Sequence, residues 1–250
     1  MIVIKTAREL SKMRDAGRIS SRALRLAGEA VEPGVTTLEI DTVVRKYIEE
    51  QGAKPSFLGY GGFPGSACIS INNEVIHGIP SKKRTLKKGD IVSIDIGAYF
   101  EGFHGDNAWT FPCGEVSEEA QAIMDVTRES LFEGIKQAKA GNRIGDIASA
   151  VQQYAEARSY SVVRDFVGHG VGAKLHEEPS VPNFGTPGRG VRLLPGMTIA
   201  IEPMINAGTH RVKILGDKWT TVTVDGKLSA HFEHSVAITP DGPVILTKPD

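Results

Sequence analysis

The sequence is poor in cysteine and has no long hydrophobic run. Only Cys68 and Cys113 occur among 250 residues, too few for a disulfide-stabilised secreted domain, so a reducing, cytoplasmic compartment is expected. No segment approaches the roughly 18 consecutive apolar residues that cross a bilayer. Charged residues interrupt the N-terminal MIVIKTARELSKMR, which is therefore not expected to be a signal peptide.

The chain has a net charge of only −1 and lacks several catalytic motifs. Its 29 Lys and Arg residues balance 30 Asp and Glu residues, so overall charge does not favour binding to nucleic acid or a membrane surface. The basic run Ser81–Lys88 is typical of a solvated turn, and a transient contact with ribosomal RNA is left open. The absence of GxSxG, of a GK[ST] phosphate loop and of a complete dinucleotide fingerprint argues against covalent serine catalysis and nucleotide binding.

Local signals predict four helices and a set of short strands. Capping boxes at Thr6–Glu9 and Thr36–Glu39 predict helices that end near Pro33-Gly34 and Gly52. Further helices are expected from Ser117 to Gly141 and from about Ile144 to Ser159. Gly168–Gly172 is expected to be a turn. Strands are expected at Cys68–Ile71, Ile91–Thr110 (as a hairpin), Val162–Val167, Met197–Glu202, Trp219–Val224 and Leu228–Ile238.

The hairpin at Ile91–Thr110 carries two aspartates. A turn centred between Phe100 and Glu101 would place Asp95 opposite Asp106, with Cβ atoms about 5 Å apart. Like charges that face each other are destabilising, and neither strand contains Lys or Arg. A divalent metal ion between the carboxylates is the economical interpretation. The alternative is a pair of solvated aspartates beside a turn.

The two halves of the chain repeat one pattern. The spacing from glycine to acid is six residues both in Gly89–Asp95 and in Gly196–Glu202. The two acids lie 107 residues apart, and so do the helix-breaking Gly34 and Gly141. We expect a single α+β domain of two related halves, residues 6–113 and 114–240, around a central, mostly antiparallel sheet with a helix pair from each half.

The repeat predicts a metal centre. The pseudo-two-fold axis would bring together Asp95, Asp106, Glu202 and Glu233, with His169 beside them. These are more ligands than one ion needs, so two divalent ions about 3.5–4 Å apart are expected, bridged by Glu202 or Glu233. Oxygen ligands with one imidazole suit Mn, Fe, Co or Zn. A hydroxide bridging the ions would be the nucleophile, because metal binding lowers the pKa of water from about 15.7 to about 7.

The other histidines are less informative. His176 could hydrogen-bond to a substrate carbonyl or its oxyanion, whereas a lone histidine such as His77 is more often structural. The remaining histidines are not expected to bind metal: His104, His210, His231 and His234.

Seven motifs together resemble the type I methionine aminopeptidases, and the resemblance covers essentially the whole chain. They are HGIP at 77–80, SIDIGA at 93–98, FHGD at 103–106, GHGVG at 168–172, LHEEP at 175–179, IEPM at 201–204 and FEHSVA at 232–237. The resemblance implies the curved "pita-bread" fold and removal of the initiator methionine from nascent polypeptides whose second residue is small. It also implies the short bacterial-type form, without the extension of eukaryotic enzymes. The Asn107-Ala-Trp109 run departs from the usual family pattern.

The resemblance also implies residue roles. The five predicted ligands would hold the two ions, and Glu202 would handle the proton of the attacking water. His77 and His176 would contact the scissile peptide and stabilise the tetrahedral intermediate. The methionine pocket would be lined by Tyr60, Phe63, Cys68 and Trp219, with Phe57 and Leu175 nearby. A monovalent cation is implied near Asn72 and Ser229.

The sequence argues against three alternatives. A proline-specific aminopeptidase or dipeptidase would carry a further N-terminal domain, and a creatinase-like enzyme would lack the five ligands. A non-catalytic peptide- or histone-binding relative would also lose the metal residues. The expected protein is therefore a cytoplasmic, monomeric hydrolase that acts on nascent polypeptide N-termini.

Overall fold

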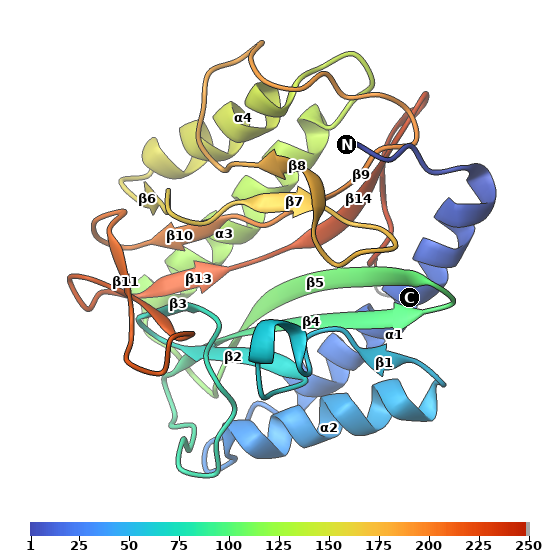
Figure 1. Cartoon of the computed structure of the whole chain (residues 1–250). Coiled ribbons are helices and arrows are strands. Elements are labelled where there is room, and N and C mark those ends of the chain that lie inside the picture. The colour runs from blue at the N-terminus through green and yellow to red at the C-terminus, as the bar shows by residue number, and fades with distance from the viewer. Residues whose placement is uncertain (249–250) are drawn as a thin grey trace.

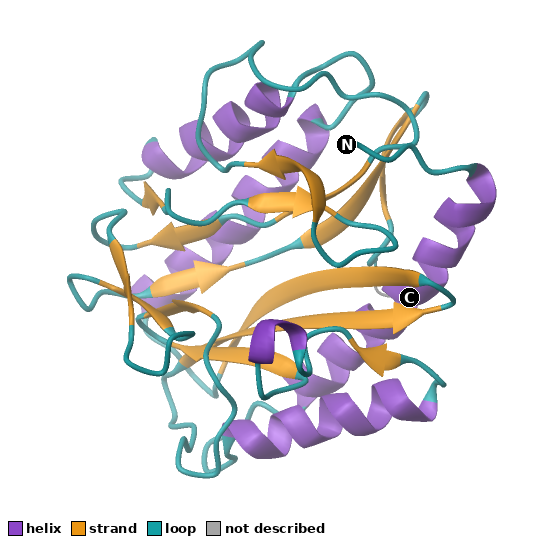
Figure 2. Cartoon of the chain, in the orientation of Figure 1, coloured by secondary structure: helices purple, strands orange, loops and turns teal. Residues whose placement is uncertain are grey.

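The computed structural model describes residues 1–248, which form helices outside and strands between them (Figures 1 and 2). The helices are α1 (Ala7–Glu29), α2 (Thr37–Glu50), α3 (Glu118–Gln137) and α4 (Ile144–Glu156), with a short 3-10 helix, η1 (Tyr60–Gly62). The strands of the first half are β1 (Lys54–Pro55), β2 (Ala67–Ile71), β3 (Glu74–Ile76), β4 (Ile91–Phe100) and β5 (Phe103–Pro112). Those of the second half are β6 (Ser161–Val162), β7 (Gly168–Gly170), β8 (Glu177–Val181), β9 (Thr198–Ile201), β10 (Met204–Asn206), β11 (Val212–Ile214), β12 (Thr221–Thr223), β13 (Ser229–His231), β14 (His234–Thr239) and β15 (Gly242–Ile245).

Each helix pair covers its own group of strands. Helices α1 and α2 pack against β2, β4 and β5, whereas α3 lies behind β9, β10 and β13 (Figure 1). The two largest hydrophobic clusters of the described residues follow this division, because each sheet buries one face against one helix pair. All described strand pairs are antiparallel, and the longest sheet path has the order β15-β14-β9-β7-β8. The expected α+β class with outer helix pairs is confirmed.

The helix starts predicted from capping boxes are confirmed. The Thr6 hydroxyl accepts the Glu9 N–H at 3.3 Å, and Thr36 caps Glu39 in the same way. These signals are reliable because both partners lie within one turn of chain.

Other sequence predictions in the second half were wrong. The strand expected at Val162–Val167 ends at Val162, and the one at Leu228–Ile238 is broken between β13 and β14. Gly168 and Gly170 lie in strand β7 rather than in a turn, and neither has a positive φ. A Cβ on Gly168 would lie 2.4 Å from the Ala200 carbonyl oxygen. This glycine therefore permits close strand approach, and does not serve a turn.

The predicted register of the aspartate hairpin was wrong by two residues, because the turn is centred between Glu101 and Gly102. The turn consists of Glu101 and Gly102 alone, both with positive φ (48° and 92°), as two-residue hairpins favour. Asp106 therefore lies opposite Gly97, and Asp95 lies opposite Ala108. The two carboxylates still share one face of the hairpin, because a shift of two residues keeps the side-chain direction. They are diagonal neighbours rather than direct partners.

Several backbone contacts recur with the spacing of 107 residues. The Gly34 N–H donates to the Leu86 carbonyl at 2.9 Å, and the Gly141 N–H donates to the Leu193 carbonyl at 2.9 Å. Both glycines have left-handed backbones, with φ of 96° and 94°. An isolated bridge joins Thr36 to Thr85, and another joins Arg143 to Arg192.

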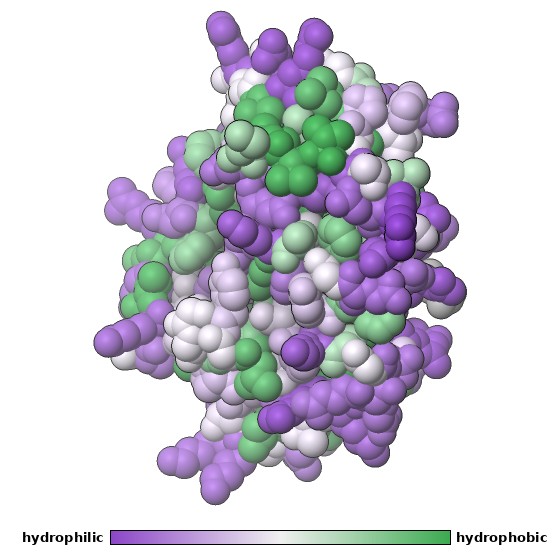
Figure 3. Space-filling view, turned by 45° about the vertical axis from the view of Figure 1, so that its right-hand side comes forward, coloured by the Kyte–Doolittle hydropathy of each residue, from purple (hydrophilic) through white to green (hydrophobic). Residues whose placement is uncertain are grey.

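No helix in the described residues is long and apolar enough to cross a membrane. Hydrophobic surface gathers near the top of the face shown in Figure 3, among mixed polar surface. Exposed large hydrophobic residues near the N-terminus are Met1, Val3 and Ile4.

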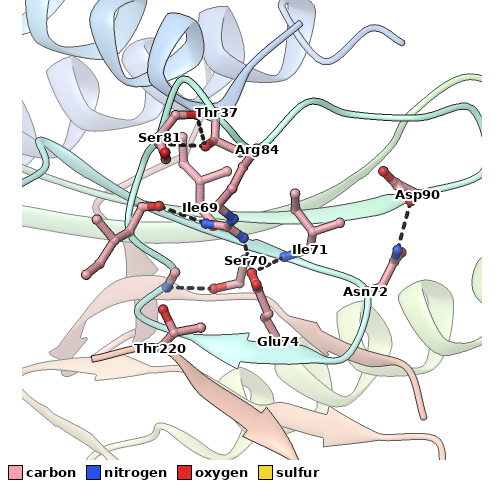
Figure 4. Close-up of polar contacts among 12 residues, drawn as sticks. Thr37, Ile69, Ser70, Ile71, Asn72, Glu74, Ser81, Arg84, Asp90 and Thr220 are labelled. Atoms are coloured by element: carbon pink, nitrogen blue, oxygen red, sulfur yellow. Dashed lines mark hydrogen bonds and ion pairs between the residues drawn. The ribbon is translucent and has the colours of Figure 1, made fainter. Parts of the chain in front are cut away.

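The basic run Ser81–Lys88 is not simply a solvated turn. Lys82, Lys83, Lys87 and Lys88 are exposed, but the Arg84 guanidinium is directed inward (Figure 4). It donates to the carbonyl oxygens of Ile69 at 3.1 Å and Ile79 at 2.8 Å, and it pairs with Glu74. Arg84 therefore braces the loop that follows His77 against strand β2.

Candidate active site

The predicted ligands lie where the two helix–sheet halves meet. Asp95 and Asp106 belong to β4 and β5, and His169 belongs to β7. Glu202 directly follows β9, and Glu233 occupies the break between β13 and β14.

A seam of hydrogen bonds fixes this meeting of the halves. The Glu233 N–H donates to the Ala108 carbonyl at 2.9 Å, and the Ala108 N–H returns to the Glu233 carbonyl at 3.4 Å. On either side, side-chain hydroxyls join the strands. Thr110 donates to the His231 carbonyl at 2.8 Å, and Ser235 donates to the Asp106 carbonyl at 2.7 Å. The break between β13 and β14 therefore sets the position of Glu233 beside β5.

The side chains of the ligand set converge on one cavity. Ligand atoms of Asp106, His169 and Glu233 all lie within 4.8 Å of one another. The His169 Nε2 atom is 3.7 Å from Asp106 Oδ2 and 3.5 Å from Glu202 Oε1. Asp95 lines the same cavity. Four carboxylates and one imidazole thus surround one small space.

No positively charged side chain of the described residues neutralises these carboxylates. No Lys or Arg among residues 1–248 lines this cavity. Burial raises the pKa of Asp106 to about 7. Burial, together with the neighbouring carboxylates, raises the pKa values of Asp95, Glu202 and Glu233 well above their ordinary range. Within the described chain, one buried oxygen each of Asp95, Asp106 and Glu233 has no hydrogen-bond partner. Such groups are costly unless a positive ion or a proton satisfies them, so this donor set fits divalent metal binding.

His169 is oriented as a metal ligand would be. Its Nδ1–H donates to the Gly170 carbonyl at 2.8 Å, which leaves the Nε2 lone pair directed at the carboxylates. Burial, and then the nearby His176, lowers the pKa of His169 to about 4. The imidazole is therefore neutral near pH 7 and able to donate its lone pair.

The two other candidate histidines stand at the wall of the cavity. His176 hydrogen-bonds through Nδ1 with the Tyr60 hydroxyl at 2.7 Å, and its ring centroid is 4.2 Å from that of His169. His77 has a positive φ of 60°, and its ring meets Trp219 edge-on at 6.1 Å. Burial lowers the pKa of His77 to about 4 and also lowers that of His176. A non-glycine residue held at positive φ is a strained position, of the kind found at functional sites.

The remaining wall is apolar and aromatic. The cavity has a volume of about 210 Å³. Phe63 and Trp219 meet edge-on with ring centroids 5.2 Å apart. All the residues expected to form or flank a methionine pocket line it: Phe57, Tyr60, Phe63, Cys68, Leu175 and Trp219. Sequence reasoning missed Ile76, Phe166 and Val167, which also line it, because nothing in their local pattern separates them from ordinary core residues.

The histidines expected to stay out of the ligand set do not line the cavity. His104 hydrogen-bonds with Ser56 and His234 with Thr247. His231 lies behind the ligands, with Nε2 3.7 Å from Glu202 Oε2. Burial, and then His77, lowers its pKa to about 3, so it contacts Glu202 as a neutral ring.

Comparison with known proteins places this site in a class. Residues 11–240 match the model of metallopeptidase family M24, which defines the chain as a metallohydrolase with the pita-bread fold. The methionine aminopeptidase of Clostridium perfringens is 56% identical over 99% of both chains. Methionine aminopeptidase 1 of Bacillus subtilis is 53% identical over 99% of this chain and 100% of its own. The crystal structure of the Thermotoga maritima methionine aminopeptidase, 48% identical, superposes with a TM-score of 0.98, covering 99% of this chain and 100% of that one.

The chain therefore belongs to the type I methionine aminopeptidases of metallopeptidase family M24.

Proposed function

We propose that this methionine aminopeptidase, which removes N-terminal methionine, acts on nascent polypeptides whose second residue is small and uses two divalent ions held by Asp95, Asp106, His169, Glu202 and Glu233. The observation that carries this proposal is a set of buried carboxylates with no Lys or Arg side chain beside them in the described chain, next to an imidazole oriented toward them. Eight carboxylate oxygens and one nitrogen exceed what one ion coordinates, which supports two. Their identity among Co, Mn, Fe and Zn depends on supply as well as on ligands.

Bound divalent ions would supply a water of lowered pKa, about 7 instead of about 15.7, and positive charge beside the substrate carbonyl. The residues of the chain carry out the proton transfers. Glu202 accepts the proton of the attacking water on a carboxylate oxygen and passes it to the leaving amine. The neutral His231 ring lies beside that carboxylate, with its Nε2 atom 3.7 Å from Glu202 Oε2.

His77 and His176 act on the scissile peptide. Both are neutral near pH 7, because burial lowers their pKa values. Each can therefore present an N–H to a carbonyl oxygen and its oxyanion without adding a charge to the site. The Tyr60 hydroxyl, 2.7 Å from His176 Nδ1, holds that ring in place.

The apolar end of the cavity receives the methionine side chain. Its walls are Tyr60, Phe63, Cys68 and Trp219, and a thioether packs favourably against aromatic edges. The volume of about 210 Å³ suits one side chain and little more. Specificity for methionine follows from this size and from the absence of charged groups at that end.

Further proposals concern the organisation and the surroundings of the site. The chain is one catalytic domain of two related halves, 6–113 and 114–240, supported by the contacts repeated at 107 residues. It works as a cytoplasmic monomer with at most a transient ribosome contact. A monovalent cation binds near Asn72 and Ser229, whose backbones are already joined by a 2.9 Å hydrogen bond.

The test combines activity with metal analysis. Protein prepared without added metal is assayed on Met-Ala-Ser and on a Xaa-Pro peptide, then again with Co or Mn. We expect metal-dependent release of methionine from the first peptide only, with close to two ions bound. Protein that holds the ions but fails to cleave Met-Ala-Ser would reject the proposal, and cleavage of the Xaa-Pro peptide alone would favour a proline-specific enzyme.

A further inference from the structure

His77 is held in an unfavourable backbone conformation at the wall of the catalytic cavity. Its φ of 60° lies in the left-handed region, which residues other than glycine rarely adopt. The imidazole meets the rings of Phe166 and Trp219 edge-on, at centroid distances of 5.8 and 6.1 Å. These contacts act on the side chain and not on the backbone. The left-handed conformation is therefore imposed by the chain on either side of His77.

The next residue, Gly78, is pressed against strand β2. A Cβ atom on Gly78 would lie 2.1 Å from the Ile69 carbonyl oxygen, so this position has no room for a side chain. The Gly78 N–H donates to the Ser70 hydroxyl at 3.1 Å, and the Gly78 carbonyl accepts the Ile69 N–H at 2.8 Å. Ser70 is 2% exposed, so water competes little for this contact. Strand β2 thus fixes the backbone that directly follows His77.

The Arg84 guanidinium joins the segments on both sides of His77. It donates to the carbonyl oxygens of Ile69 on β2 and Ile79 in the loop after His77. It also pairs with Glu74 of β3, the strand that leads into His77 (Figure 4). The Arg84 and Glu74 side chains are only 24% and 18% exposed, and hydrogen bonds from a charged donor are stronger than neutral ones. One side chain therefore connects β2, β3 and the loop between which His77 turns.

We propose that Arg84 is a positioning residue for His77, and that its contacts keep the imidazole directed at the scissile peptide. The inference rests on the proposed function, in which His77 presents an N–H to the substrate carbonyl. Without the guanidinium, the carbonyls of Ile69 and Ile79 lose the donor that they share, and the loop can move away from β2. His77 then relaxes from its left-handed backbone, which displaces the ring. Arg84 does not line the catalytic cavity, so its effect on the reaction passes through His77.

The test compares Arg84→Met with wild type on Met-Ala-Ser, in protein loaded with Co or Mn. We expect kcat to fall about 10- to 100-fold, because a displacement of about 1 Å can cost about 10²-fold. KM should change less than about twofold, since the contact that is lost forms mainly in the transition state. Metal content should stay at the wild-type value. Lys83→Met, which removes an exposed neighbouring cation, is the matched control and should leave kcat and KM unchanged.

A milder variant acts on the same contact from β2. Ser70→Ala removes only the hydroxyl that accepts the Gly78 N–H. It should lower kcat about three- to tenfold, the effect expected from one net hydrogen bond. Arg84→Lys should restore part of the kcat lost in Arg84→Met, because it keeps a charged donor without the planar guanidinium. Each variant is assayed at a temperature at which circular dichroism shows it fully folded.

A double-mutant cycle separates positioning from a general loss of structure. If Arg84 acts through His77, adding Arg84→Met to His77→Ala should lower kcat by less than about threefold. A loss as large as in the wild-type background would show that Arg84 acts by another route, and would overturn the proposal.

The other outcomes distinguish this proposal from the proposed function. No cleavage of Met-Ala-Ser by metal-loaded wild type would reject the proposed function, and the role of Arg84 with it. Wild-type kcat in folded Arg84→Met, when His77→Ala is impaired, would overturn the positioning role alone. A loss of bound metal in Arg84→Met, or a kcat loss that Lys83→Met reproduces, would also overturn it.

Discussion

Replacing Asp106 with asparagine should stabilise the metal-free protein, although it removes a proposed ligand. Asp106 is 3% exposed, lies among other carboxylates, and has one buried oxygen without a partner among the described residues. Ionising it in that setting is unfavourable, which is why burial raises its pKa from 3.8 to about 7. Asparagine keeps the shape of the side chain and cannot ionise.

The size and sign of the effect follow from that pKa. A carboxyl whose folded pKa is raised contributes fully to stability below its unfolded pKa and loses this contribution as pH rises through its folded pKa. At about 1.36 kcal/mol per pH unit, the loss reaches about 4 kcal/mol for Asp106 above pH 7 and about 2 kcal/mol at pH 5.5. Asp106→Asn should therefore exceed wild type by these amounts in chelator.

Urea denaturation at several pH values measures the difference directly. Histidines with lowered pKa values that do not contact Asp106 destabilise both proteins equally at low pH and cancel in the comparison, so the difference is read above pH 5, where His169, with its pKa of about 4, is neutral. Asp241→Asn, at an exposed turn position, is the control and should change stability little at any pH. Metal at about 100 times its Kd for wild type should remove up to about 2.7 kcal/mol of the variant's advantage for each ion that the variant no longer binds. A stability difference that is absent at pH 8, or that does not change with pH, would refute the electrostatic argument for the metal centre.

Three other substitutions test separate parts of the structure. His77→Ala should lower kcat about 10²–10³-fold with close to two ions retained; loss of metal on elemental analysis would show that its role is misassigned. Lys5→Met should cost about 3–5 kcal/mol in urea denaturation, because Glu177 is left buried and unpaired, and adding Glu177→Gln should recover most of it. Arg84→Met should lower the free energy of unfolding by about 3 kcal/mol in the same measurement. Arg84→Lys should restore only part of this loss, because an ammonium group cannot reproduce the guanidinium contacts with Glu74 and two carbonyl oxygens.

The parts of the fold that the sequence predicts well are those decided within a few residues. The capping boxes at Thr6 and Thr36 located two helix starts because the capping groups lie three residues apart. Arg84 shows the opposite case. Its neighbours in sequence are exposed lysines, and its partners at Ile69 and Glu74 become visible only when the loop closes on β2. A charge pattern alone could not separate one inward arginine from a solvated run.

Glycine was the second source of error, because its two uses look alike in a sequence. At Gly102 it supplies the positive φ of the hairpin turn. At Gly168 it provides space for the Ala200 carbonyl in a neighbouring strand. The first use depends on local backbone and can be predicted, whereas the second depends on which strand arrives from elsewhere in the chain.

The positions of the predicted metal ligands depend on contacts between residues that lie still farther apart in the sequence. The register error between Asp95 and Asp106 did not separate the two carboxylates, because a shift of two residues preserves the face of the sheet. Glu233 is different, since it reaches the same face only through the backbone pair with Ala108 and a break in its own strand. The backbone pair between Glu233 and Ala108, which places this ligand, also joins β5 to the second half of the chain. Any ion bound there must therefore stabilise the contact between the halves as well as take part in hydrolysis.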